Sequence, residues 1–174
     1  RQKIKKILVT GLILFFILVF AIVLLFRFIP IPTTPYMISE TSNHGAISYS
    51  WVNLRDVSAS VPLSIVAAED VNFCHHWGFD LAAIRSAIEQ GSKRGASTLS
   101  QQVVKNLFLW HQRSWIRKAF EAVLTPVVEI SWPKKRILEV YLNIAEFDEG
   151  IFGIEEASQK LFGMSSSKLS LQQA

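Results

Sequence analysis

The sequence predicts a mainly α-helical protein in which one membrane-spanning helix precedes a helical domain. Three observations carry this prediction. An uncharged run extends from Ile7 to Phe26, apolar residues recur at helical spacing in several later segments, and no segment alternates between apolar and polar residues as a half-buried strand would. Of the 174 residues, 50% are hydrophobic and 18% are charged, a composition that excludes a disordered chain.

The run from Ile7 to Phe26 has the length and composition of a bilayer-spanning helix, because a hydrocarbon core of about 30 Å needs about 20 apolar residues. A cleaved signal peptide is the alternative, but Arg27, Phe28 and Pro30 stand where the small residues of a cleavage site would lie. We therefore predict an uncleaved anchor over residues 7–29. The basic flank at residues 1–6 places the amino terminus in the cytoplasm and the rest of the chain outside it.

The net charge of +4 is unevenly distributed along the chain. After Arg27 there are 13 Lys and Arg against 14 Asp and Glu, so the high pI comes from the membrane flank and gives no reason to expect a nucleic acid. Residues 85–136 hold ten cations and three carboxylates between two acidic flanks, which suits an anionic ligand or a solvated basic face. The single cysteine, Cys74, excludes an intrachain disulfide and a multi-cysteine metal cluster.

After the anchor, residues 30–60 read as a proline-rich tether and a polar, irregular, membrane-proximal segment, with a short extended piece at 51–54. Helices are predicted over 62–70, 80–90, 97–110, 115–130, 134–147 and 153–162, and a flexible basic loop over 91–96. Pro126 lies inside the fourth of these helices and is expected to interrupt it with a kink. The domain over 61–174 is expected to be incomplete at its carboxyl end, because the chain stops in the middle of a polar-to-apolar pattern at residues 171–174.

Two adjacent carboxylates, Glu69 and Asp70, end an apolar segment and lead into a loop of aromatic and histidine residues. Carboxylates at an apolar helix end tend to have altered proton affinity, which a general base needs. One alternative is a polar helix end without chemistry. Another is a metal site at His75 and His76, although the H-E-x-x-H spacing of zinc sites is absent.

The segment from Ser97 to Trp110 forms two stripes when drawn as a helix. The apolar stripe consists of Leu99, Val103, Leu107 and Trp110, and the polar stripe of Thr98, Gln102 and Lys105. The polar stripe carries a hydroxyl, an amide and an ammonium group, all able to donate to phosphate or sugar oxygens, and the helix amino terminus adds free N–H groups. An ordinary amphipathic helix explains the same pattern.

Two further segments carry charge at helical spacing. Arg117, Lys118 and Glu121 share one helix face, either as a surface ion-pair set worth less than about 1 kcal/mol or as an anion clamp beside a carboxylate. The segment from Lys134 to Asn143 has a core face at Ile137 and Tyr141, which favours a scaffolding role.

These blocks, in this order, resemble the peptidoglycan glycosyltransferase family, the transglycosylase domains of penicillin-binding proteins and their monofunctional relatives. The pattern E-D-x-x-F-x-x-H-x-G-x-D falls on Glu69, Asp70, Phe73, His76, Gly78 and Asp80. The pattern G-x-S-T-x-[ST]-Q-Q-x-x-K-N falls on Gly95, Ser97, Thr98, Ser100, Gln101, Gln102, Lys105 and Asn106. R-K-x-x-E falls on Arg117, Lys118 and Glu121, K-x-x-I-L-E-x-Y-L-N on residues 134–143, and G-x-x-G on Gly150 and Gly153. The single anchor and short chain are most similar to the monofunctional type, although a bifunctional protein cut after its first domain would also match.

The resemblance implies a lysozyme-like helical lobe with a smaller membrane-proximal lobe. It implies an inverting enzyme that polymerises lipid II into β-1,4-linked glycan and releases undecaprenyl pyrophosphate. Glu69 would be the general base for the 4-hydroxyl of the acceptor GlcNAc, and Glu121 a second catalytic carboxylate beside the pyrophosphate. The implied substrate-binding residues are Asp70, Phe73, His76, Ser97, Thr98, Gln102, Lys105, Asn106, Arg117 and Lys118. The resemblance is compatible with a divalent cation, Mg or Mn, but identifies no residues that would bind it. It implies no organic cofactor.

The implied partners are lipid II, the growing glycan strand, the membrane and other cell-wall synthesis proteins, with no nucleic acid. The implied location is the bacterial inner membrane, with the catalytic domain in the periplasm. Two other classes remain open. A lysozyme-like hydrolase would also use an acidic residue but would need no pyrophosphate clamp, and an inactive membrane-tethered scaffold would not need Glu69, Lys105 and Glu121 together.

Overall fold

The computed structural model of the chain describes residues 2–91, 95 and 97–174. It forms two compact units, Arg1–Pro30 and Ile31–Ala174. Most of the basic loop predicted at residues 91–96 lies outside the described residues.

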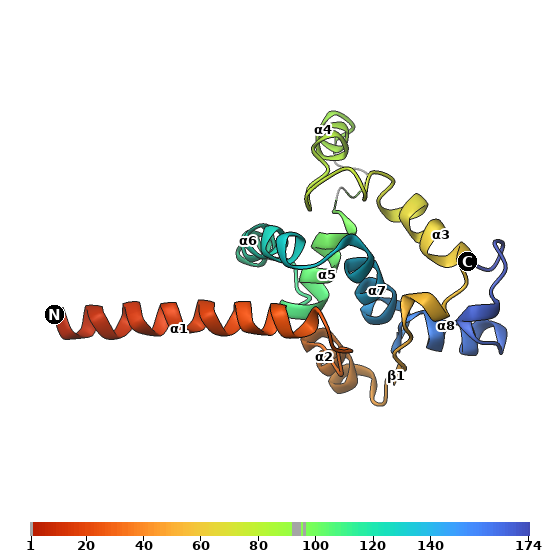
Figure 1. Ribbon diagram of the computed structural model, residues 1–174, viewed down its shortest axis with the longest axis horizontal. Coiled ribbons are helices and arrows are strands. Elements are labelled where there is room, and N and C mark those ends of the chain that lie inside the picture. The colour runs from red at the N-terminus through yellow and green to blue at the C-terminus, as the bar shows by residue number, and fades with distance from the viewer. Residues whose placement is uncertain (1, 92–94, 96) are drawn as a thin grey trace. The chain divides into compact units, whose positions relative to one another are not determined.

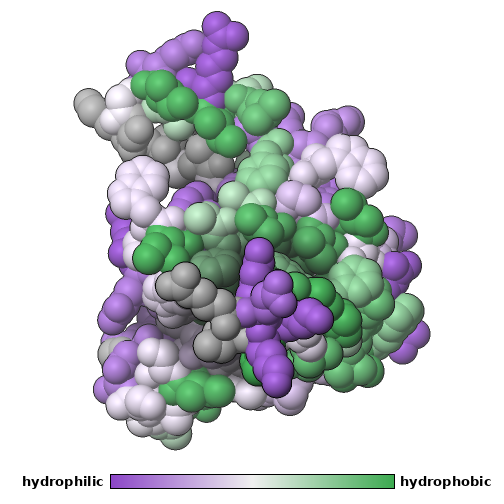
Figure 2. Space-filling model, turned by 90° about the vertical axis from the view of Figure 1, so that its left-hand side faces the viewer, coloured by the Kyte–Doolittle hydropathy of each residue, from purple (hydrophilic) through white to green (hydrophobic). Residues whose placement is uncertain are grey.

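The first unit consists mainly of α1, which spans Gln2–Phe26 (Figure 1). Its segment Lys5–Phe26 is long and apolar enough to cross a membrane, which fits the predicted single anchor. Figure 2, which views this helix from its amino-terminal end, shows hydrophilic residues at the tip, and in the sequence the charged residues precede the apolar run and do not interrupt it.

The second unit is mainly helical, as predicted. Its described α-helices are α2 (Pro35–His44), α3 (Ser60–Glu69), α4 (Leu81–Glu89), α5 (Leu99–Phe108), α6 (Trp115–Ser131), α7 (Lys134–Ile144) and α8 (Ile154–Phe162). Two short 3-10 helices, η1 (Leu54–Asp56) and η2 (Ser166–Lys168), complete the helical part. The six helices predicted from the sequence are all present. Pro126 does not interrupt α6, which runs through it as one helix.

A small sheet, which the sequence did not predict, joins two distant parts of this unit. It contains β1 (Ser48–Tyr49), β2 (Glu146–Asp148) and β3 (Ile151–Phe152) in the order β1-β3-β2. β1 is parallel to β3, and β2 is antiparallel to it. Strands this short show no alternation of apolar and polar residues, and β2 begins where the predicted helix over 134–147 was expected to continue.

The prediction of an irregular segment over residues 36–60 was wrong, because α2 forms within it. Thr34 caps this helix by accepting the N–H of Met37 at 3.1 Å, and Pro35 occupies the first turn, where its missing N–H costs nothing. The expected extended piece at 51–54 is not a strand. Residues 51–53 have irregular backbone, and Leu54 is the first residue of η1.

The fourth motif holds that irregular piece in place. The side chain of Asn143 accepts the Val52 N–H and donates to the Val52 carbonyl, both at 2.8 Å. Glu139 accepts the Leu54 N–H at 2.9 Å. These contacts give the motif the scaffolding role that its sequence favours.

α5 is the central helix of the unit and packs against both α6 and α7 (Figure 1). Leu99, Val103 and Leu107 of the predicted apolar stripe are buried in this contact, whereas Trp110 lies beyond the end of the helix and is 42% exposed. A second cluster, formed by Val57, Val61, Leu142, Ile154 and Leu169, joins α3, α7, α8 and the carboxyl-terminal segment. The central position of α5 brings the second and third motifs face to face.

Candidate active site

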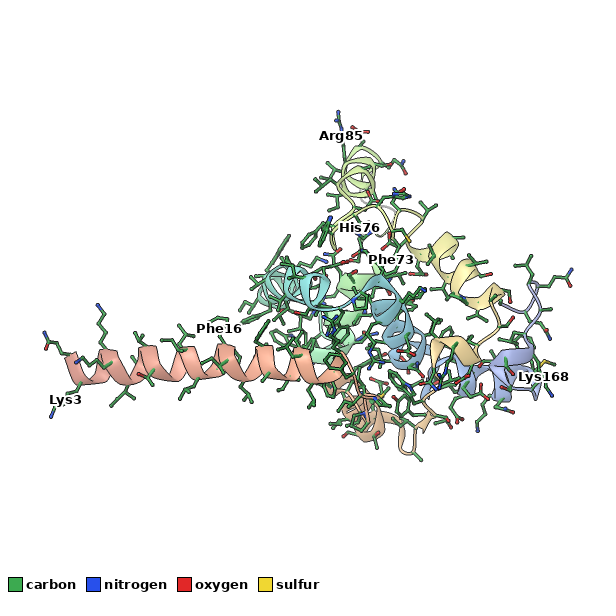
Figure 3. The ribbon with its side chains drawn as sticks, viewed as in Figure 1. Lys3, Phe16, Phe73, His76, Arg85 and Lys168 are labelled. Carbon is green, nitrogen blue, oxygen red and sulfur yellow. The ribbon has the colours of Figure 1, made fainter. Side chains whose placement is uncertain are left out.

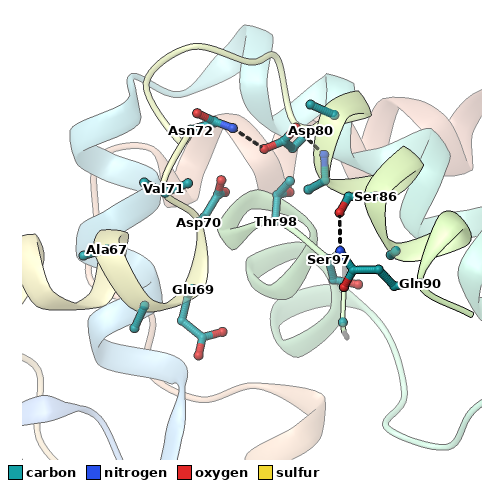
Figure 4. A pocket seen from close by; sticks show the side chains of 15 residues that line it. Ala67, Glu69, Asp70, Val71, Asn72, Asp80, Ser86, Gln90, Ser97 and Thr98 are labelled. Carbon is teal, nitrogen blue, oxygen red and sulfur yellow. Dashed lines mark hydrogen bonds between the residues drawn. The ribbon is translucent and has the colours of Figure 1, made fainter. Parts of the chain in front are cut away.

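The two adjacent carboxylates of the first motif point in different directions. Glu69 is the last residue of α3, and Asp70 leaves the helix with φ −159° and ψ 72°. Figure 4 shows the Glu69 carboxylate directed into the open space beside α5, whereas the Asp70 side chain turns toward Thr98. Glu69 is exposed and Asp70 is 6% exposed, so Glu69 is the more accessible of the two carboxylates.

Asp70 ties the first motif to the start of α5. Its carboxylate accepts the His76 Nε2 proton at 2.9 Å and the Leu99 N–H at 3.0 Å. The Gly78 N–H donates to Nδ1 of His76 at 3.1 Å, so that nitrogen is the acceptor and the imidazole proton lies on Nε2. We interpret Asp70 and His76 as positioning residues, because their polar atoms are engaged inside the protein.

Replacing Asp70 with asparagine should lower stability more than it lowers the rate of catalysis. The amide keeps one acceptor oxygen but brings an NH₂ group against donors that the carboxylate now satisfies. We expect a loss of about 1–3 kcal/mol in the free energy of unfolding, measured with urea. A folded Asp70→Asn protein with unchanged stability and no activity would contradict the assignment.

Gly78 and Thr98 form a close contact between the first and second motifs. Gly78 has φ +89°, and a Cβ there would lie 2.5 Å from Cγ2 of Thr125 in α6, so no larger residue fits. The Thr98 hydroxyl donates to the Gly78 carbonyl at 2.7 Å and accepts the Gln101 N–H at 3.2 Å as the N-cap of α5. Thr98 is therefore a buried cap.

Glu69 is held by the second motif. Gln102 Nε2 donates to Glu69 Oε2 at 2.9 Å across the gap between α5 and α3. Glu69 lines a cavity of about 340 Å³, here called the base pocket, whose walls also include Asn72, Asp80, Ser97 and Gln90 (Figure 4). Asp80 caps α4, and its hydrogen bond from the Ala83 N–H lowers the pKa of its carboxyl.

A second cavity, of about 550 Å³ and here called the cation pocket, adjoins the first. Its lining residues are Ser97, Gln101, Gln102, Lys105, Arg113, Ser114, Trp115, Arg117, Lys118 and Glu121. Ser97 lines both cavities, and Gln102 lines the cation pocket while binding Glu69. The candidate base and the cations therefore lie in neighbouring parts of one site.

Glu121 organises two of the cations. It is 2% exposed and accepts hydrogen bonds from Arg117 Nη1, at 3.0 Å, and from Lys118 Nζ. Lys118 also donates to the Ser97 hydroxyl at 3.3 Å. Glu121 and Arg117 are buried and Lys118 is half-exposed, so this set is not the fully solvated surface ion-pair set that the sequence left as an alternative.

The cation pocket holds more positive charge than its one carboxylate balances. No carboxylate among the described residues forms an ion pair with Lys105 or Arg113. Burial, followed by the nearby Arg117 charge, lowers the pKa of Lys105. A bound anion would relieve a crowded set of cations of this kind, so the pocket is a candidate anion site.

The other predicted site residues lie deeper. Phe73 and His76 are neighbours in the segment joining α3 to α4 (Figure 3), and Phe73 is 1% exposed beneath the Lys134 ammonium, 4.4 Å from its ring centre. Asn106 is buried, and its Oδ1 accepts no hydrogen bond from the described residues. The structure therefore brings nine predicted site residues to the cavities, namely Glu69, Asp70, Ser97, Thr98, Gln102, Lys105, Arg117, Lys118 and Glu121, whereas Phe73, His76 and Asn106 line neither cavity.

The sequence reasoning missed Arg113 and Tyr141. Arg113 lines the cation pocket, and only its membership of the strongly basic segment 85–136 pointed to it. Burial, together with the Glu69 charge, raises the pKa of Tyr141 to about 12, so its phenol remains protonated.

The donor set of the cation pocket does not suit a divalent metal ion. Its carboxylate, Glu121, is engaged by Arg117 and Lys118, and hard cations such as Mg prefer several free oxygen ligands. The alternative site at His75 and His76 fares no better, because both ring nitrogens of His76 are engaged by Asp70 and Gly78.

Comparison with known proteins gives consistent matches. The family model described as Transglycosylase matches residues 37–174. A biosynthetic peptidoglycan transglycosylase from Jannaschia sp. (strain CCS1) is 49% identical over 173 residues, which are 99% of this chain and 72% of the relative. Proteins of the same name from Haemophilus influenzae (strain PittEE) and Marinomonas sp. (strain MWYL1) are 47% and 50% identical, with 93% and 91% of this chain and 72% of each relative covered.

Proposed function

This chain belongs to the transglycosylase family and is a peptidoglycan glycosyltransferase of cell-wall synthesis, and we propose that Glu69 is the base with which it joins lipid II units. The observation that supports this proposal most strongly is the hydrogen bond from Gln102 to Glu69. It joins an accessible carboxylate to a pocket rich in cations.

Glu69 would take the proton of the acceptor 4-hydroxyl as that oxygen attacks C1 of the donor sugar. The new C–O bond forms as the bond from C1 to the pyrophosphate oxygen breaks, so the configuration at C1 inverts. The electron pair leaves with undecaprenyl pyrophosphate, and the proton passes from Glu69 to solvent. Gln102 holds one carboxylate oxygen, at 2.9 Å, and leaves the other for the substrate.

The leaving group is already ionised and needs charge stabilisation more than protonation. Lys105, Arg117 and Lys118 line the pocket next to the base and are placed to bind the pyrophosphate. Glu121 would act through these cations by fixing Arg117 and Lys118, as its contacts with both of them support. No step is assigned to a metal ion.

A hydrolase that cuts the same glycan is the second candidate. It would use an acidic residue in a similar position, but the surplus charge at Lys105 and Arg113 would have no task in it. An inactive scaffold would not need that charge beside Glu69 either. The cation pocket therefore favours transfer from a pyrophosphate donor.

One experiment separates the three functions. The purified full chain is given lipid II in one reaction and preformed glycan in another, and the products are resolved by gel and mass spectrometry. Transfer predicts long glycan in the first reaction and unchanged glycan in the second. Fragments in the second reaction would identify a hydrolase, and no change in either would identify a scaffold.

We also propose that the chain is a single-pass protein of the inner membrane, with its amino terminus in the cytoplasm. The basic residues before α1 support this orientation. An exposed apolar stripe on α6, formed by Ile116, Phe120, Val123 and Ile130, supports contact of the catalytic unit with lipid.

Removing residues 1–27 should lower activity on membrane-embedded substrate more than it disturbs folding. The anchor confines the site to the surface where both lipid-linked substrates lie, and loss of such tethering typically lowers the effective concentration by roughly tenfold or more. Rates in lipid II-containing liposomes and the thermal midpoint of both forms test this. Equal rates in liposomes would remove the role of the anchor.

A further inference from the structure

A second cluster of side chains lies outside both pockets. The ring of Tyr36, in α2, stacks on the imidazole of His111, in the connection between α5 and α6, with centroids 4.0 Å apart and planes at 8°. The ring of Phe152 packs edge-on against the ring of Tyr36, with the two ring centroids 5.4 Å apart. The Tyr36 hydroxyl donates to Glu146 Oε2, and Glu146 Oε1 accepts the Gly150 N–H at 3.0 Å. The sheet thus fixes Tyr36 from two sides.

The same cluster is connected to the cation pocket through the backbone of Gln112. Gln112 follows His111, and its carbonyl accepts the Nε proton of Arg117 at 3.1 Å. Nη1 of the same guanidinium group donates to Glu121 at 3.0 Å. Because a guanidinium group is planar, these two bonds together fix its orientation in the pocket.

The connection that carries His111 depends on side-chain contacts for its position. Among the described residues, Trp110 to Arg113 make no backbone–backbone hydrogen bonds. His111 and Tyr36 therefore supply a restraint that the backbone of this connection does not.

Burial and the bond to Glu146 raise the pKa of Tyr36, so its phenol remains a donor. Burial and the Lys105 charge lower the pKa of His111, so the stacked ring adds no charge to the pocket.

We propose that Tyr36 and His111 are positioning residues, whose stacked rings hold the Gln112 carbonyl and thereby set the orientation of Arg117 in the cation pocket. The proposal rests on the proposed function, in which that pocket binds the pyrophosphate. Tyr36 lies just before the residues that the family model matches, so that match assigns nothing to it. Stacked aromatic contacts of this kind change an equilibrium by roughly threefold to tenfold.

The test compares His111→Ala, which removes the stack, with His111→Phe, which keeps a flat ring on Tyr36. His75→Ala is the matched control, because His75 is an exposed histidine that lines neither pocket. We expect His111→Ala to raise the KM for lipid II roughly threefold to tenfold with a smaller change in kcat, since Arg117 binds the pyrophosphate before and during transfer. His111→Phe should restore most of the affinity, and His75→Ala should leave it unchanged.

A second readout does not depend on activity. Hydrogen exchange at Nε of Arg117 is followed by NMR in the full chain with ¹⁵N-labelled arginine, and the signal is assigned by its loss in Arg117→Lys. His111→Ala should speed this exchange several-fold, and His111→Phe should slow it again. If exchange is unchanged in His111→Ala, the positioning role is overturned, whether or not the protein polymerises lipid II. If the wild type makes no polymer while exchange responds as expected, the proposed function fails and the positioning role stands.

Discussion

Glu69→Gln is expected to fold normally, to bind lipid-linked substrate and to lose polymer formation by about 10²-fold or more, the usual worth of a positioned general base. Glutamine has nearly the shape of glutamate, but its amide cannot take the acceptor proton at neutral pH. The open position of Glu69 beside α5 makes a folding defect unexpected. The measurement is the initial rate of glycan formation, with substrate binding measured separately.

Gln102→Glu provides a useful companion, since it replaces the donor to Glu69 with a second carboxylate. Two carboxylates at hydrogen-bond distance would share a proton, and the pH for maximal activity should rise. A folded Glu69→Gln protein that polymerises within a few-fold of the wild type would show that the proton goes elsewhere. An inactive but stable Asp70→Asn protein would point to the adjacent residue instead.

Lys105→Ala is expected to lower the rate at subsaturating lipid II by roughly tenfold to a hundredfold. Loss of a charge-assisted contact typically costs about 1.5–3 kcal/mol, and alanine preserves the helix. Lys105 lines the cation pocket, and no carboxylate among the described residues forms an ion pair with it. Its charge is therefore available to the pyrophosphate. The measurement is kcat/KM with lipid II.

Lys135→Ala is the matched control, because Lys135 is an exposed cation of the same basic segment that lies outside both pockets. It should leave kcat/KM unchanged. Equal losses in the two variants would mean that general attraction of an anionic substrate, rather than a contact in the pocket, explains the effect of Lys105.

The helices could be predicted because each carries its own local signal. The apolar stripe at Leu99, Val103 and Leu107 predicted the buried face of α5, and the Asp80 cap predicted the start of α4. α2 was missed because its residues combine few apolar positions with many polar ones. The sheet was missed because β1 pairs with β3, which lies about a hundred residues later in the sequence. Both strands are too short to show an alternation of apolar and polar residues.

The residues of the site could be named from the sequence, but their roles could not be separated. Glu69 and Asp70 are adjacent, and only the turn of the backbone at Asp70 directs one carboxylate outward and the other inward. Thr98 belongs to the polar stripe that the sequence predicts, yet as the N-cap of α5 it uses its hydroxyl within the protein. The stack of Tyr36 on His111 had no local signal, because it joins two elements distant in sequence.

The central claim is that this site transfers glycan from a pyrophosphate donor, and the most direct test counts products. The full chain is incubated with lipid II, and the glycosidic bonds formed are compared with the undecaprenyl pyrophosphate released. Transfer predicts one carrier released for each bond formed, with both products reduced by about 10²-fold or more in Glu69→Gln. Release of the carrier without new glycosidic bonds, or cleavage of existing bonds without release of the carrier, would contradict the account.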